Sequence, residues 1–344
     1  MEEKIYKEIN KTFESIDLPY QDMKGKSILI TGANGLIGRM VIKSLCVINE
    51  KYGLHLCILA LVRKEVTIQE IFADEIKKGY VKALTGDIRE EMQIFEDIDY
   101  IIHGASMTAS KAFIENPVEV IMTNILGTKS IMELAYKKKV SSVVFLSSME
   151  TYGFTEMETV LTEDKMEYLN PLNVRSCYPE SKRMAENLCV SYFTQYHVPV
   201  KIIRLAQTFG YGVDGNDKRV FAEFATCARE KRNIHLLTDG ASKRMYLDTI
   251  DAATAILTVL LKGESGTAYN AANKETYCSV KEMAEFVAKN VAGGEIKVTI
   301  NENVDNAKQF PPPHRLFLDV SRMEGLGWRA KTGLAEMYGR MLSR

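Results

Sequence analysis

The sequence is poor in the residue patterns that build disulfides and metal sites. Its six cysteines are scattered without any CxxC spacing, and its five histidines show no metal-ligand spacing. We therefore expect reduced, mostly packed thiols, as in a cytoplasmic protein, and no metal site. No hydrophobic run is long enough to span a bilayer, and the first residues lack a signal-peptide pattern. The sequence thus predicts a cytoplasmic protein without membrane contact.

An excess of charge of one sign is also absent. The 344 residues carry 44 lysines and arginines against 45 aspartates and glutamates, a net charge of −1. Such a balance gives no general attraction to nucleic acid. Hydrophobic residues make up 46% and charged residues 26%, as in an ordinary globular protein, and the length allows two domains.

From Lys26 onward, short apolar runs rich in β-forming residues alternate with stretches of helical periodicity. The predicted strands cover 27–31, 55–62, 80–86, 99–105, 142–148 and 200–206, and the predicted helices cover 36–49, 66–78, 117–138, 178–197 and 249–262. Strands that are apolar on both faces and separated by helices indicate a parallel α/β sheet with right-handed crossovers. After residue 206 the pieces are shorter and rich in Gly, Asp and Asn, which indicates a smaller, mixed C-terminal lobe.

The stretch TGANGLIG, residues 31–38, lies where the first predicted strand turns into the first predicted helix. Gly32 would permit the tight turn, Gly35 the close approach of a pyrophosphate, and Gly38 the packing of helix on strand. The free N–H groups and the partial positive charge at the helix start suit phosphate. We therefore expect a Rossmann-type doubly wound sheet, with cofactor contacts from Gly32, Asn34, Gly35, Leu36, Ile37 and Gly38.

The spacing G-x-x-G-x-x-G resembles that of the short-chain dehydrogenase/reductase superfamily, and later motifs resemble its extended branch, which modifies nucleotide sugars. Asp87 in GDI (86–88) matches the family's aspartate at the adenine, with Ile88 beside it. HGA (103–105) matches the element after the fourth strand, and Asn124 in TNILGT matches the helix asparagine. The resemblance runs from about residue 26 to residue 328. It implies an NAD(P) cofactor contacted also by Asp87, Ile88, Ala105 and Asn124.

The second predicted strand ends in ALVRK, residues 60–64. An NAD-binding protein usually has an acidic residue here that accepts from the adenosine 2′-hydroxyl. None is present, and Arg63 could instead meet a 2′-phosphate, although it could also be a plain surface arginine. The pattern favours NADP over NAD without excluding NAD.

Tyr178 and Lys182 in CYPESK lie four residues apart, on one face of a predicted helix. They match the catalytic pair of the resembled family, and Ser148 falls at its catalytic Ser or Thr. The resemblance implies that Tyr178 takes a proton from a sugar hydroxyl while hydride leaves the same carbon. The lysine and the positive nicotinamide would favour the phenolate, since free tyrosine has a pKa of about 10. Ser148 would hydrogen-bond the oxygen being oxidised.

Glu150 stands two residues after Ser148, just past the predicted strand 142–148. In the resembled branch, a sugar oxidised at C4 can lose a C6 substituent, lose carbon dioxide from a C6 carboxylate, or become the 4-epimer. Dehydratases and decarboxylases of this branch carry Glu here, which implies that Glu150 is the base at C5. Many hexose 4,6-dehydratases also have an aspartic acid one residue earlier. This chain has Met149 there, which cannot transfer a proton.

Two further stretches, 175–189 and 204–224, resemble UDP-glucuronate decarboxylases, except that Gln207 stands where the family usually has Asn. This likeness favours a decarboxylase or a dehydratase, a lyase in either case. A nucleotide-sugar 4-epimerase and an NADPH-dependent keto-sugar reductase stay open as alternatives. A cofactor-sensing binding protein without activity is a remote one.

The organisation predicted from these patterns has three parts. An N-terminal helical extension covers 1–24, an NAD(P)-binding domain covers 25–205 plus 244–263, and a nucleotide-sugar lobe covers 206–243 plus 264–344. We expect a nucleotide-diphosphate sugar to contact cationic and polar side chains, namely Thr108, Ser148, Gln207, Arg219, Arg244 and Arg315. The resemblance also implies a homodimer that packs helices 117–138 and 178–197 into a four-helix bundle.

Overall fold

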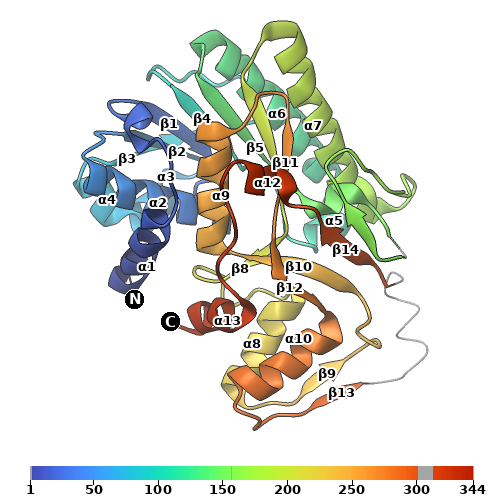
Figure 1. Cartoon of the computed structure of the whole chain (residues 1–344). Helices are drawn as coiled ribbons and strands as arrows, with labels where there is room; N and C mark the ends of the chain where they lie inside the picture. The colour runs from blue at the N-terminus through green and yellow to red at the C-terminus, as the bar shows by residue number, and fades with distance from the viewer. Residues whose placement is uncertain (1, 156, 301–312, 344) are drawn as a thin grey trace.

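The computed structural model describes residues 2–155, 157–300 and 313–343. Within these ranges a seven-stranded parallel sheet forms the larger lobe (Figure 1). Its order is β3 (Val81–Thr85), β2 (Cys57–Val62), β1 (Ser27–Thr31), β4 (Tyr100–His103), β5 (Ser142–Ser148), β7 (Val200–Leu205) and β11 (Ala268–Ala271). The chain runs from β1 to one edge, returns beside β1 as β4, and runs to the other edge. This is the doubly wound arrangement that the sequence predicts.

Both faces of this sheet are buried, which explains the continuous apolar runs of its strands. In β1, Ile28 and Ile30 face one hydrophobic core while Leu29 faces another, as the period of two in a strand requires. Helices cover the two faces in pairs (Figure 1). The first face holds α2 (Leu36–Tyr52) and α9 (Thr249–Lys262), and the second holds α6 (Pro117–Lys138) and α7 (Cys177–Tyr196).

One predicted helix, over 66–78, is wrong as a single element. The structure has two shorter helices, α3 (Glu65–Ile71) and α4 (Ala73–Lys77). Between them the backbone leaves the helical conformation at Phe72, whose side chain is buried in the core of the larger lobe. Burial of this ring outweighs the helical periodicity of the surrounding residues.

The smaller lobe has sheets and a core of its own. Its main sheet has the order β12 (Asn273–Ser279), β10 (Lys243–Asp248), β14 (Arg315–Leu318) and β6 (Thr159–Leu161), with β8 (Gln207–Phe209) also paired to β10. A separate pair is formed by β9 (Ile234–Leu236) and β13 (Val298–Ile300). The core between them is built by α8 (Val220–Glu230), α10 (Val280–Phe286), a π-helix (Val287–Val291) and α13 (Leu334–Leu342).

The sheets cross the predicted domain boundaries at three places. β11, predicted in the nucleotide-sugar lobe, is the edge strand of the large sheet because it pairs in parallel with β7. β6 and most of β10, predicted in the NAD(P)-binding domain, belong to the smaller lobe. The sheet to which a strand belongs depends on its pairing with strands that are distant in the sequence. Dividing the sequence into a few continuous ranges therefore does not assign every strand to the correct lobe. Residues 301–312 of the predicted lobe lie outside the described residues.

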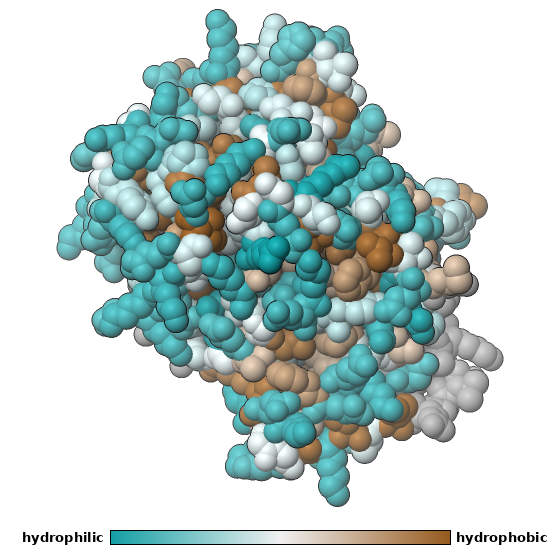
Figure 2. Space-filling model, in the orientation of Figure 1, coloured by the Kyte–Doolittle hydropathy of each residue, from teal (hydrophilic) through white to brown (hydrophobic). Residues whose placement is uncertain are grey.

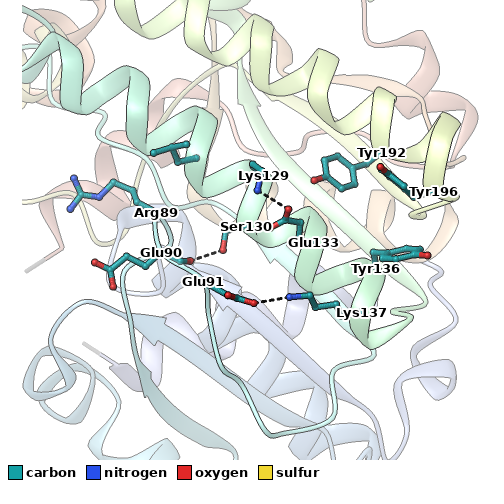
Figure 3. A pocket seen from close by; sticks show the side chains of 11 residues that line it. Arg89, Glu90, Glu91, Lys129, Ser130, Glu133, Tyr136, Lys137, Tyr192 and Tyr196 are labelled. Carbon is teal, nitrogen blue, oxygen red and sulfur yellow. Dashed lines mark hydrogen bonds and ion pairs between the residues drawn. The ribbon is translucent and has the colours of Figure 1, made fainter.

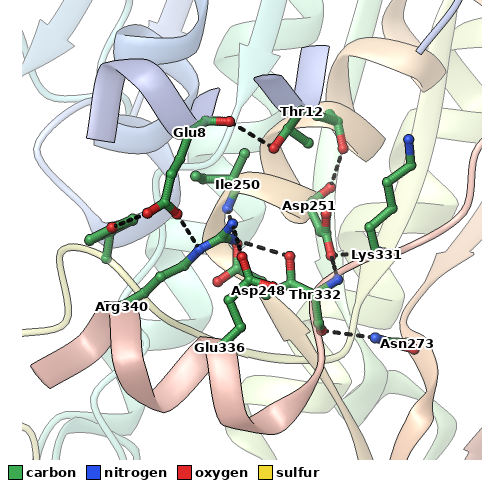
Figure 4. A network of polar contacts seen from close by, with 12 residues as sticks. Glu8, Thr12, Asp248, Ile250, Asp251, Asn273, Lys331, Thr332, Glu336 and Arg340 are labelled. Carbon is green, nitrogen blue, oxygen red and sulfur yellow. Dashed lines mark hydrogen bonds and ion pairs between the residues drawn. The ribbon is translucent and has the colours of Figure 1, made fainter. Parts of the chain in front are cut away.

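The helix α1 (Glu2–Glu14) joins the two lobes from the N-terminal side. Its apolar side packs on α2 and α9 through Ile5, Ile9 and Phe13. Figure 4 shows its polar side. Glu8 accepts hydrogen bonds from Arg340 Nε in α13 at 2.7 Å and from the Tyr211 hydroxyl at 2.8 Å, and Arg340 Nη1 also reaches the buried Asp248 at 2.5 Å. The two ends of the chain therefore meet at the junction of β10 and α9.

The face of the molecule in Figure 2 is mostly hydrophilic, with hydrophobic side chains gathered in small separate patches. No helix in the described part of the chain combines the length and hydrophobicity needed to cross a membrane. The same residues contain no group of three or more His, Cys, Asp or Glu side chains that could hold a metal ion. All six cysteines are free thiols, so no disulfide constrains the fold.

Candidate active site

The first strand of the large sheet ends in a turn that requires glycine. Gly32 has φ of +71°, and a Cβ atom on it would lie 2.8 Å from the backbone carbon of Gly104. A Cβ atom on Gly38 would lie 2.2 Å from the carbonyl oxygen of Gly32, closer than non-bonded atoms approach. Gly35 is the N-cap of α2, so the helix begins with free N–H groups beside this turn. The cradle fits the pyrophosphate of a dinucleotide.

A cavity of about 570 Å³ lies beside the glycine turn. Six predicted cofactor residues line it, namely Gly32, Asn34, Arg63, Asp87, Ile88 and Ala105; three others, Leu36, Ile37 and Gly38, form the first turn of α2. Lys64 and Arg89 line it as well, and the sequence patterns did not single them out. Arg89 donates from Nε to both oxygens of Asp87 at 3.0 Å, which lowers the pKa of that carboxyl.

The HGA motif is held by a hydrogen-bond network that fixes the tautomer of His103. Thr31 Oγ1 accepts from the backbone N–H groups of Gly104 at 3.2 Å and Ala105 at 3.1 Å. Its own hydrogen therefore points to His103 Nδ1, 2.7 Å away. His103 Nε2 then carries the ring hydrogen and faces Thr128 Oγ1 at 3.3 Å. Burial lowers the pKa of this neutral imidazole to about 3.

Asn124, predicted as a cofactor contact, is buried in α6 between two neighbouring elements. Its Oδ1 accepts from Ser106 in the loop after β4, and its Nδ2 donates to Ser181 in α7, both at 2.8 Å. Ser181 donates in turn to the carbonyl of Tyr178 at 3.0 Å. Asn124 thus connects the loop after β4 to the helix that carries Tyr178.

The structure brings Ser148, Tyr178 and Lys182 together where β5 ends beside α7. The Ser148 side chain lies close enough to the Tyr178 hydroxyl to lower its pKa. Lys182 Nζ donates to the carbonyl of Leu146 at 2.8 Å and lies 6.0 Å from the centroid of the Tyr178 ring. Burial raises the pKa of Tyr178 and lowers the pKa of Lys182 to about 8. In the protein alone, the effect of burial on the pKa of Tyr178 is thus larger than the stabilisation of the phenolate expected from the charge of Lys182.

Sequence reasoning missed two residues beside Tyr178, Phe113 and Arg175. Phe113, from the short helix α5 (Ala112–Glu115), stacks on the Tyr178 ring with centroids 4.6 Å apart and planes 17° apart. The Arg175 guanidinium lies 4.5 Å from the centroid of Phe113. Arg175 belongs to the decarboxylase-like stretch 175–189, so a signal for it existed. Phe113 comes from a distant part of the chain, and no local pattern marked it.

Glu150 lies in a single 3-10 turn, η2 (Met149–Tyr152), directly after Ser148. Its backbone N–H donates to Ser148 Oγ at 3.2 Å, and its carboxylate pairs with Arg175 at 2.9 Å. The Glu150 and Arg175 side chains are 35% and 40% exposed, whereas Met149 is buried in the core of the larger lobe. The turn therefore places the Glu150 carboxylate beside Tyr178 and the Met149 thioether in the core.

In the smaller lobe, the structure joins two predicted substrate residues. Arg244 Nη1 donates to Gln207 Oε1 at 3.3 Å, and its Nη2 lies 3.1 Å from His314 Nε2. Arg244 Nε is buried and has no hydrogen-bond partner among the residues described. A buried guanidinium N–H without a partner is costly, so this atom is a candidate donor to a ligand.

Among the remaining predicted substrate residues, Arg315 lies beside Arg244, because β14 pairs with β10 in the register Lys243 to Arg315 and Arg244 to Leu316. Arg219 is bound bidentately by Asp217, with Nε to Oδ1 at 3.1 Å, and Arg315 lies 3.8 Å from Glu158. Thr108 is exposed in the loop between β4 and α5. Their roles toward a substrate remain predictions.

The buried His103 predicts a measurable loss of stability in acid. The unfolded chain binds a proton at a pKa of 6.5 and the folded protein at about 3, so unfolding takes up a proton below pH 6.5. This contribution to stability is complete above pH 6.5 and is lost as the pH falls toward 3. Between pH 7 and pH 5 it amounts to about 2 kcal/mol. Urea unfolding of the wild type should show this loss, and His103→Gln should lack it; equal pH dependence in both proteins would contradict the assignment.

Comparison with known sequences gives a family and its relatives. The sequence model of the NAD dependent epimerase/dehydratase family matches residues 28–272. UDP-glucuronic acid decarboxylase 6 of Arabidopsis thaliana is 29% identical over 317 residues, which cover 90% of this chain and 85% of the relative. UDP-glucuronic acid decarboxylase 1 of Xenopus tropicalis is 27% identical over 321 residues, with 90% and 70% covered.

Solved structures share the fold at lower sequence identity. The dTDP-glucose 4,6-dehydratase of Streptomyces venezuelae, with NAD and TYD bound, gives a TM-score of 0.75 at 21% identity, over 92% of this chain and 95% of that one. The UDP-glucuronic acid 4-epimerase of Bacillus cereus, in complex with UDP-glucuronic acid and NAD, gives 0.76 at 19% identity, over 92% and 98%. With the match running from β1 to just past β11, the chain belongs to the NAD dependent epimerase/dehydratase family, an enzyme family of the extended short-chain dehydrogenase/reductase type.

Proposed function

We propose that this enzyme removes carbon dioxide from a nucleotide-bound hexuronic acid, with NAD(P) as an internal redox cofactor. The two sequence relatives described above are decarboxylases that align over nine-tenths of the chain. Dehydratases and 4-epimerases share the fold. The choice among these reactions therefore rests on the side chains around Tyr178.

Met149 is the observation that carries the choice between decarboxylation and dehydration. Loss of a C6 hydroxyl needs an acid that protonates the leaving oxygen, but Met149 has no proton to give and is buried in the core. Carbon dioxide leaves as a neutral molecule and needs no such acid. Beside the site stand instead Glu150 and Arg175, a carboxylate and a guanidinium 2.9 Å apart. A guanidinium is the side chain best suited to pair with a C6 carboxylate.

The residues divide the reaction into two halves. Tyr178 would take the proton of the C4 hydroxyl while Ser148 hydrogen-bonds the same oxygen. A bound nicotinamide would supply the hydride acceptor for C4 and, once reduced, the hydride donor. In the second half the C5–C6 bond breaks, carbon dioxide leaves, and the electron pair forms an enolate between C4 and C5. Glu150, whose side chain is 35% exposed, would take up a proton from water and deliver it to C5, and Tyr178 would return its proton to the C4 oxygen when the hydride returns to C4.

A panel of nucleotide hexoses and nucleotide hexuronic acids, read by mass spectrometry, tests the reaction. We expect a hexuronic acid to lose the mass of carbon dioxide without added reductant. Loss of water would identify a dehydratase, an isomer of unchanged mass a 4-epimerase, and consumption of added NADPH a reductase. Each of these would contradict the proposal, and inertness toward the whole panel would favour a cofactor-sensing binding protein.

Glu150→Gln separates the two halves. An amide cannot deliver the proton to C5, so product formation should fall by about 10²- to 10⁴-fold. Stopped-flow absorbance should still show cofactor reduction when substrate is added. Tyr178→Phe, the matched variant at the other step, should stop the reduction itself. Turnover at the wild-type rate by Glu150→Gln would refute its role.

For the cofactor we infer a preference for NADP over NAD. Arg63 and Lys64 border the cavity at the end of β2, where ALVRK offers no acidic residue. A charge-assisted contact from Arg63 to a 2′-phosphate is worth about ten- to a hundredfold in affinity, and Arg63→Ala should lose that amount for NADP but not for NAD. Calorimetric titration of both proteins with both cofactors measures it. A wild-type preference for NAD, the cofactor present in both solved structures described above, would contradict this inference.

The nucleotide diphosphate is assigned in this proposal to the smaller lobe. Arg244 supports this, because its buried Nε lacks a hydrogen-bond partner in the described residues. Arg219 and Arg315 are the further cations that we propose for the diphosphate, and Thr108 and Gln207 are proposed for the sugar. Six free thiols favour a reducing compartment, and we place the enzyme in the cytoplasm.

A homodimer formed by α6 and α7 is also part of the proposal. These two helices carry exposed hydrophobic side chains, among them Ile121, Met122, Leu126, Tyr136, Met184 and Tyr196. Figure 3 shows a groove beside them in which three tyrosines lie next to the ion pairs Lys129–Glu133 and Lys137–Glu91. A second copy would bury the hydrophobic side chains in a four-helix bundle. Sedimentation velocity tests this, and a monomer at micromolar concentration would contradict it.

A further inference from the structure

A single buried ion pair stands behind the turn that carries Glu150. Glu186 in α7 and Arg204 in β7 are joined by three contacts, Arg204 Nε to Glu186 Oε1 at 3.0 Å and to Oε2 at 3.3 Å, and Nη2 to Oε2 at 2.7 Å. Their side chains are 8% and 5% exposed. Burying such a pair costs desolvation, so a buried ion pair is weak evidence for a gain in stability. Its contacts with the surrounding residues are more informative.

This ion pair holds the catalytic turn at both ends. Ser147, which precedes Ser148, donates to Glu186 Oε1 at 2.5 Å. On the far side of Glu150, the Tyr152 hydroxyl accepts from Arg204 Nη1 at 3.0 Å and donates to Asn270 Oδ1 at 2.7 Å. Tyr152 is fully buried. Ser148 to Thr151 therefore lie between two residues, Ser147 and Tyr152, each of which is hydrogen-bonded to one partner of the same salt bridge.

The helix that supplies Glu186 also supplies the catalytic pair. Glu186 follows Lys182 by one turn of α7, on which Tyr178 also lies. A third anchor comes from the same helix, since Arg183 donates from Nε to the carbonyl of Thr151 at 2.7 Å. Two supports of the turn, Arg183 and Glu186, thus lie on the same helix as the catalytic pair, whereas Arg204 reaches the turn from β7. Tyr178 itself is held by other contacts, because Phe113 stacks on its ring.

We propose that Glu186 and Arg204 are positioning residues that set Glu150 relative to Tyr178 through Ser147 and Tyr152. Within the described residues, their hydrogen bonds reach neither Tyr178 nor the Glu150 side chain, and they act through the turn. The two halves of the reaction then depend on different supports. Hydride transfer depends on Tyr178 and Lys182, and the proton step at C5 depends on the anchored turn. The inference rests on the role of Glu150 in the proposed function.

Single-hydroxyl deletions test the idea without breaking the buried ion pair. Tyr152→Phe removes the contact at one end of the turn, and Ser147→Ala removes the contact at the other. In both variants we expect kcat for product formation to fall at least tenfold, while KM and the stopped-flow rate of cofactor reduction stay within about twofold. Tyr20→Phe is the matched control: its hydroxyl is also buried and donates to the carbonyl of Phe13 at 3.1 Å, remote from the site. It should leave all three quantities unchanged.

Three results would overturn the inference. They are equal losses in product formation and cofactor reduction, wild-type kcat in the two variants, and the same selective loss in Tyr20→Phe. A general loss of structure would lower both rates together, so it cannot imitate the expected split. Failure of the proposed function looks different, because Glu150→Gln would then turn over normally. With Glu150→Gln inactive, a wild-type kcat in Tyr152→Phe and Ser147→Ala rejects the positioning role alone.

Discussion

Burial of the large sheet on both faces is the constraint on which the proposed active site depends. Parallel strands that are covered by helices on each side all end at the same edge, where the chain leaves the core. The strand register aligns Thr31 of β1 with His103 of β4, and His103 with Phe145 of β5. The glycine turn, the HGA motif and Ser148 therefore lie along one edge although they are far apart in the sequence. A loss of parallel register would separate the phosphate cradle from the catalytic turn.

Burial sets the electrostatics of this edge as well. It raises the pKa of Tyr178 and lowers that of Lys182, so both side chains are pushed toward their neutral forms in the protein alone. Glu150 adds to the effect on Tyr178, because its negative charge also raises the pKa of the phenol, whereas the charge of Arg175 lowers it. A base near neutral pH thus needs a positive charge beside the ring, which the oxidised nicotinamide has. We therefore expect Tyr178 to act as a base only when oxidised cofactor is bound beside it.

Spacing along the chain marked those parts of the candidate site that consist of local patterns. The glycine turn, Tyr178 with Lys182, and Ser148 with Glu150 are local patterns, and the fold brings them together. Contacts between distant segments could not be predicted from such local patterns. Phe113 reaches Tyr178 from α5, Arg204 reaches Tyr152 from β7, and β11 joins the large sheet after the chain has passed through the smaller lobe. Arg175 was visible in a resembling stretch, but its pairing with Glu150 depends on the turn geometry.

In the proposed reaction, an internal oxidation at C4 is followed by loss of carbon dioxide and protonation at C5. Turnover of a nucleotide hexuronic acid in heavy water, followed by NMR of the product, tests it most directly. We expect a product one carbon shorter with one deuterium at C5 and the original hydrogen retained at C4, because the hydride leaves and returns without meeting solvent. Deuterium at C4, or a product that keeps its C6 carboxylate, would contradict it.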